Sequence, residues 1–84
     1  MKQYIKNYIE YYNIGEQDII LCQIEDCGQQ AVDIHHVTFK SQCGTDRVGN
    51  LIALCREHHD QAHSNKLTKD FLYAIIKNQT PICK

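Results

Sequence analysis

The chain has 84 residues, nine basic and ten acidic, and its formal net charge is −1. Such a chain forms one small domain, which buries only about 60–65% of its unfolded surface and commonly needs a metal or a disulfide for stability. The balanced charge excludes the basic stripe of a dedicated nucleic-acid binder, and no apolar run approaches the roughly 18 residues of a membrane span, so a soluble protein is expected.

Residues 3–12 carry apolar and tyrosine side chains spaced as one face of a helix that ends before Gly15. These side chains are Tyr4, Ile5, Tyr8, Ile9, Tyr11 and Tyr12. We expect an N-terminal helix within residues 1–14 that covers the core, and a dimer face is the alternative use of its tyrosines.

Two strands are predicted next. The run DIILC predicts a strand ending at Cys22, and AVDIHHV predicts another, whose apolar face is formed by Val32, Ile34 and Val37. The stretch CQIEDCGQQ between them predicts a turn in which Gly28 supplies backbone freedom after Cys27.

A polar loop, TFKSQCGTDRVGN, is expected to lead into helices. Asn50 is a favourable N-cap, so NLIALC predicts the start of a helix, and a second helical run ends at His63. Thr68 is expected to cap a last helix within residues 68–78. Its apolar stripe consists of Phe71, Leu72, Ile75 and Ile76. The sequence therefore predicts a small α+β domain over residues 1–84, with its core at 20–63.

Five cysteines, an odd number, occur together with five histidines. This composition favours metal ligation in a reducing compartment over a disulfide framework. The N-terminus has no signal-peptide pattern, so a cytoplasmic location is expected. Cys43 and Cys83 have no ligand partner at a useful spacing and are interpreted as spare thiols.

A first metal site is predicted from two close pairs of ligands. Cys22 and Cys27 form C-x4-C on the turn, and Cys55 and His58 form C-x2-H at the start of a helix. Structural zinc takes four such ligands in tetrahedral geometry. The alternative is a set of buried free cysteines, which are common in protein cores.

A second metal site is predicted from the remaining histidines. His59 and His63 share a helix face, and this face is rotated by about 100° from that of His58. His35 and His36 end a strand, so three nitrogens could hold a metal while one imidazole stays uncoordinated as a general base. The alternative is that His35 and His36 are surface histidines, and neighbours in a regular strand point to opposite faces.

The stretch DIHHVTFKSQCGTDRVGNLIALCREHH resembles the HNH endonucleases. That resemblance implies a ββα-metal core with a treble-clef-like zinc site at Cys22, Cys27, Cys55 and His58. It covers about residues 20–63 and excludes the first and last helices. Cys43 stands where a loop glycine is common in the family.

The resemblance also implies roles for individual residues of that stretch. His36 falls on the general base and Asn50 on the residue that pins the loop. His35, His59 and His63 fall on the ligands of a catalytic divalent cation, which could be Mg²⁺, Mn²⁺, Ni²⁺ or Zn²⁺. The implied activity is hydrolysis of DNA phosphodiester bonds with 5′-phosphate and 3′-hydroxyl products.

The expected partner is double-stranded DNA, with a homodimer or a larger assembly left open. Lys40, Arg47 and Arg56 are candidate phosphate contacts, although solvated surface charge explains each of them equally well. Asp33 and Asp60 are interpreted as exposed residues in preference to partners of the histidines. The main alternative function is a zinc-stabilised binding module without activity.

Overall fold

The computed structural model describes residues 2–15, 17–42 and 44–78, so Cys43 and Cys83 lie outside the described residues. Its regular elements in chain order are α1 (Gln3–Tyr11), β1 (Asp33–His36), β2 (Leu51–Leu54), α2 (Arg56–His63) and α3 (Lys69–Asn78). Two 3-10 turns, η1 (Lys40–Gln42) and η2 (Val48–Asn50), lie in the loop between the strands. The predicted small α+β class is confirmed.

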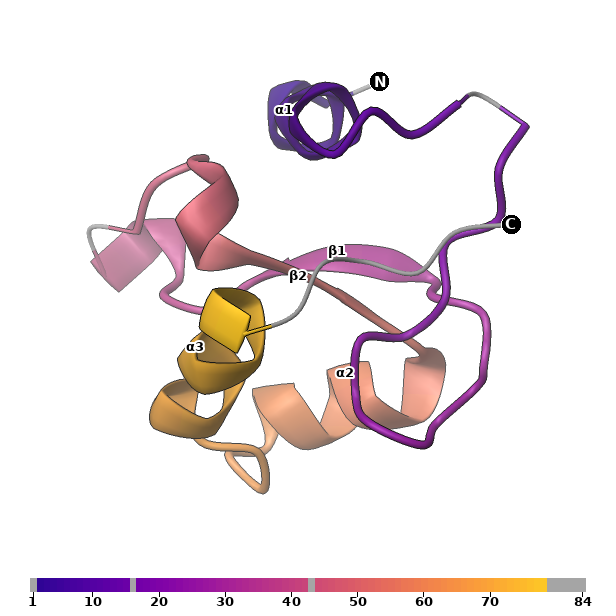
Figure 1. Ribbon diagram of the computed structural model, residues 1–84. Coiled ribbons are helices and arrows are strands. Elements are labelled where there is room, and N and C mark those ends of the chain that lie inside the picture. The colour runs from indigo at the N-terminus through magenta and orange to yellow at the C-terminus, as the bar shows by residue number, and fades with distance from the viewer. Residues whose placement is uncertain (1, 16, 43, 79–84) are drawn as a thin grey trace.

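The two strands form an antiparallel sheet that lies between α1 on one face and α2 with α3 on the other (Figure 1). Side chains alternate between these faces along each strand. Leu51 and Ala53 pack with α1, whereas Ile52 and Leu54 pack with residues of α2 and α3. Because both faces are covered, all residues of β2 are buried.

The predicted helix beginning at Asn50 is wrong, because Leu51–Leu54 is strand β2. A strand that is buried on both faces has a continuous apolar run, and such a run cannot be distinguished by periodicity from a buried helix. Its pairing decides the outcome: Leu51 lies opposite His36 and Leu54 opposite Asp33 in the register of the sheet.

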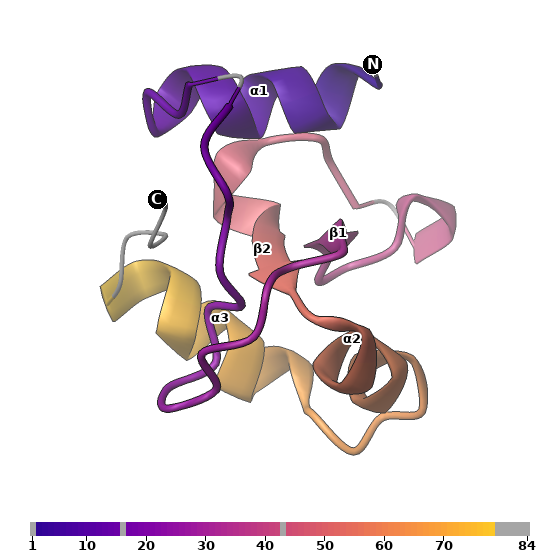
Figure 2. The same cartoon turned by 90° about the vertical axis from the view of Figure 1, so that its right-hand side faces the viewer.

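The predicted strand at DIILC is also corrected, since this segment forms only one isolated bridge, between Leu21 and Gln30. The segment runs from the α1 side of the sheet to the α2 side (Figures 1 and 2). It covers the outer edge of β2, where the backbone N–H of Gln23 donates to the backbone carbonyl of Ala53 at 2.9 Å. Cys22 and Cys27 therefore precede both strands, and the predicted turn does not connect β1 to β2.

Three residues predicted on apolar faces are exposed: Tyr11 (71%), Val32 (56%) and Phe71 (46%). Other residues predicted on the same apolar faces are buried as expected, among them Tyr8, Ile34 and Leu72. Thr68 caps α3 as predicted, because its hydroxyl accepts the Phe71 amide at 3.2 Å. None of the described helices is long and apolar enough to cross a membrane.

Candidate metal centres

Four residues that we call the cysteine group, Cys22, Cys27, Cys55 and His58, bring their donor atoms within 4.8 Å of one another. The turn before β1 supplies the first two, and its backbone reverses through Asp26 and Gly28, which have φ of 62° and 70°. The predicted role of Gly28 is thus confirmed. Cys55 is the N-cap of α2 and His58 lies in its first turn.

The distances within the cysteine group match the edges of a tetrahedron around zinc. With Zn–S of about 2.3 Å and Zn–N of about 2.0 Å, sulfurs should be ~3.7 Å apart and sulfur should be ~3.5 Å from nitrogen. Cys27 Sγ lies 3.7 Å from Cys55 Sγ. His58 Nδ1 lies 3.5 Å from Cys22 Sγ and 3.2 Å from Cys55 Sγ. The residues therefore fit a structural zinc ion.

The thiols of this group differ in acidity. Burial raises the pKa of Cys22 to about 12. Burial also acts to raise the pKa of Cys55, but backbone N–H groups at the start of α2 and the neighbouring thiols outweigh it, and this pKa is lowered. Thiolates are the metal-binding form, so Cys55 is deprotonated more readily than Cys22.

A second set, the histidine group, consists of His35, His59 and His63, whose donor nitrogens also lie within 4.8 Å of one another. His35 projects from β1 towards α2, and His59 Nε2 lies 3.3 Å from His63 Nε2. Tetrahedral nitrogen ligands at about 2.0–2.1 Å would be ~3.3 Å apart. The set therefore fits a metal ion with nitrogen donors.

His35 is buried and makes edge-on ring contacts with Phe39, His59 and His63. Burial, followed by the neighbouring His59 and His63, lowers the pKa of His35 to about 4. His35 is accordingly neutral near pH 7, which is the protonation state that ligates metals.

His36 lies on the opposite side of β1 from His35. Its ring packs against that of Tyr4 at 4.4 Å between centroids, and its Nε2 lies 2.8 Å from Asp46 Oδ1. Lys40 Nζ reaches the other oxygen of Asp46 at 3.2 Å. The hydrogen bonds from His36 and Lys40 lower the pKa of Asp46. The structure thus separates His36 from the histidine group, as strand alternation requires.

Asn50 is buried at the base of the loop, and every polar atom of its amide is bonded. Oδ1 accepts the amide of Thr38 at 2.8 Å and the hydroxyl of Tyr73 at 2.7 Å. Nδ2 donates to the carbonyls of Thr38 at 2.9 Å and Thr45 at 2.8 Å. Asn50 is therefore not a helix cap, but it does pin the loop between β1 and β2.

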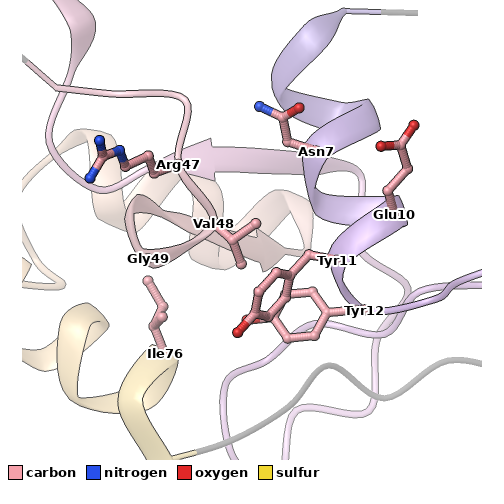
Figure 3. Close-up of a pocket in the computed structure, with 8 residues that line it drawn as sticks. All are labelled: Asn7, Glu10, Tyr11, Tyr12, Arg47, Val48, Gly49 and Ile76. Carbon is pink, nitrogen blue, oxygen red and sulfur yellow. The ribbon is translucent and has the colours of Figure 1, made fainter.

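The predicted phosphate-contacting residues are dispersed. Lys40 lies beside Asp46, Arg47 is exposed on the loop, and Arg56 is exposed at the start of α2. Arg47 also borders a hollow of about 690 Å³ between α1, η2 and α3 (Figure 3). None of the residues lining this hollow belongs to either metal group, so it is separate from the candidate chemistry.

Sequence reasoning missed three partners of these residues. Asp46 and Tyr4 contact His36, and Tyr73 bonds Asn50. Asp33, interpreted as merely exposed, lies with its Oδ2 3.7 Å from His59 Nε2. Spacing gave no signal for these contacts, because each joins segments brought together only by the fold.

No protein-family model matches the chain, and neither the curated proteins nor the solved structures include a significant match. The function is therefore inferred from the site itself.

Proposed function

We propose that the protein is a metal-dependent endonuclease of the HNH type, which hydrolyses phosphodiester bonds in DNA. The observation that carries this proposal is the placement of an oriented histidine, His36, across one strand from a three-nitrogen metal group. A binding module needs neither of these features. The order of strand, pinned loop, strand and helix in residues 33–63 agrees with the ββα-metal core that the sequence resembles.

The free edge of β1 is the proposed substrate site. β1 pairs with β2 on one side only, and in the described residues no strand covers the other side. Groups from both faces meet there: Tyr4 of α1 lies near Asp33, and Asp33 lies beside His59 of α2. A phosphate lying over this edge could reach His36 from one face and the histidine group from the other.

His36 is proposed to act as the general base through Nδ1. Its Nε2 donates to the Asp46 carboxylate, so the lone pair resides on Nδ1. Nδ1 takes a proton from water, the hydroxide oxygen bonds to phosphorus, and the P–O3′ bond breaks. Asp46 and Asn50 act as positioning residues, the first on the His36 ring and the second on the loop that carries Asp46.

The histidine group would hold one divalent cation through His35, His59 and His63. When bound, such an ion supplies Lewis-acid stabilisation of negative charge on the phosphate and the leaving oxygen. His63 is exposed and His35 is buried, so the site is open on one side only. An open coordination sphere is the property that distinguishes catalytic from structural metal sites.

The experiment is plasmid cleavage with purified protein in Mg²⁺, Mn²⁺, Ni²⁺ or Zn²⁺, comparing the parent with His36→Ala and Asp46→Asn. We expect His36→Ala to lower the cleavage rate by about 100-fold or more, because general bases contribute on this scale. Asp46→Asn should cause a smaller loss, since the ring remains but its orientation is weakened.

Zinc content and melting temperature should match the parent in both variants, which separates chemistry from folding. His36→Ala also controls for a contaminating nuclease, because it is purified in the same way. Cleavage by His36→Ala at the parental rate would remove His36 from the mechanism. Absence of cleavage by the parent with every ion and with one bound metal per chain would favour the inactive binding module.

A further inference from the structure

We propose that Asp33 is a fourth protein ligand of the ion held by the histidine group, so that this site offers three nitrogens and one carboxylate oxygen. The inference rests on the proposed function for its biological meaning, but the geometry and the test concern metal binding alone. A carboxylate at this point would change which metals the site prefers.

Strand alternation places Asp33 on the correct face. Asp33 and His35 are two residues apart in β1, so both side chains project towards α2. His59 and His63 are four residues apart in α2 and project back towards the strand. One pair of donors from the strand thus faces one pair from the helix, in the same way that two pairs form the cysteine group.

The atom that Asp33 approaches distinguishes a ligand from an orienting partner. A carboxylate that only orients a metal-bound histidine bonds the ring nitrogen that faces away from the metal. Asp33 Oδ2 instead lies 3.7 Å from Nε2 of His59, which is the nitrogen that lies 3.3 Å from His63 Nε2. The carboxylate oxygen therefore approaches the nitrogen of His59 that faces His63, from just outside the set of three nitrogens that lie within 4.8 Å of one another.

Two further groups contact the Asp33 carboxylate, the Ile34 amide and the Tyr4 hydroxyl, and neither carries a positive charge. Oδ1 accepts the amide of Ile34 at 2.8 Å, which fixes the carboxylate at the start of the strand. Among the described residues, no lysine or arginine forms an ion pair with Asp33, whereas Asp46 has Lys40. A divalent cation would be the counter-charge of Asp33.

The side chain of Asp33 is 40% exposed, so a small rotation can complete its approach without disturbing the core. Carboxylate oxygen suits Mn²⁺ and Mg²⁺ better than imidazole does, while imidazole suits Ni²⁺ and Zn²⁺. Asp33 should accordingly contribute more to Mn²⁺ affinity than to Ni²⁺ affinity.

The test is calorimetric titration of Mn²⁺ and of Ni²⁺ into protein whose cysteine group is loaded with zinc, without nucleic acid. We expect Asp33→Asn to weaken Mn²⁺ binding by about 10-fold or more and Ni²⁺ binding by clearly less. Asp60→Asn is the matched control, because Asp60 is an exposed carboxylate next to His59 in sequence. Zinc content and melting temperature verify that each variant is folded.

A second variant reports coordination directly. Asp33→Cys, with Co²⁺ in the exchangeable site, should show a thiolate-to-cobalt charge-transfer band that Asp33→Ser lacks. Equal Mn²⁺ affinities of the parent and Asp33→Asn, or no band from Asp33→Cys, would overturn the proposal. If Asp33→Asn lost Mn²⁺ affinity while the parent protein cleaved no DNA, Asp33 would be supported as a metal ligand and the nuclease function would be refuted.

Discussion

The cysteine group and the histidine group take donors from the same helix, α2, yet they have different surroundings. Cys22 and Cys55 are each only 4% exposed and lie in the core formed by β2, α2 and α3. In the histidine group, His35 is buried but His63 is exposed at the end of the helix. The cysteine group has two buried and two half-buried members, whereas the histidine group opens to solvent through His63.

The helix itself creates this difference. His58 and His59 are adjacent, so their side chains differ by about 100° around the axis. His58 is thereby directed to the turn that carries Cys22, and His59 to Asp33 and His35 on β1. A set of four ligands with sulfur donors suits a permanent structural ion, whereas a more exposed set of three nitrogens suits an exchangeable one.

The largest expected effect is that of losing the cysteine group. Structural zinc contributes roughly 10–16 kcal/mol of apparent binding free energy, which equals or exceeds the about 5–15 kcal/mol stability of a typical domain. Cys27→Ser should therefore abolish most of the folded population, as should removal of zinc by a strong chelator. Circular dichroism and thermal melting measure this.

A parent-like melting curve for Cys27→Ser would show that the cysteine group does not hold the fold together. Glu25→Gln, on the same turn and exposed, is the control for this variant.

The sharpest test of the comparison uses the adjacent histidines. His58→Ala should lose zinc and lower the melting temperature by more than about 10 °C, since about 1 kcal/mol corresponds to 4–8 °C in a domain of this size. His59→Ala should keep its zinc and melt within a few degrees of the parent, but its affinity for the exchangeable ion should fall about 10–100-fold.

Metal analysis, melting and titration of both variants give the answer. If His58→Ala kept its zinc while His59→Ala lost it, the assignment of the two helix faces would be reversed.

The smallest effect is expected for His63. Its side chain is exposed at the last residue of α2, where a ligand is held less firmly than on β1. His63→Ala should resemble His59→Ala in kind, with a smaller loss of affinity for the exchangeable ion. Titration of both variants with Mn²⁺ compares them, and an equal or larger loss for His63→Ala would contradict this ranking.

The sequence by itself determined the features that depend on spacing within one element. C-x4-C on a turn, C-x2-H at a helix start and H-x3-H along a helix indicated both groups of candidate ligands, because local geometry fixes how such residues are directed. The apolar stripes of α1 and α3 and the Thr68 cap likewise predicted these two helices to within a few residues, and the end of α2 at His63 was predicted as well.

The tertiary structure decided what depends on packing between elements. Leu51–Leu54 became a strand because both of its faces are covered, and no local pattern encodes that. Gly44 is required because a Cβ there would lie 1.8 Å from the carbonyl oxygen of Thr38, across the loop. The partners of the candidate chemistry, Asp46 for His36 and Asp33 for His59, come from separate segments that only the folded loop and sheet bring into contact.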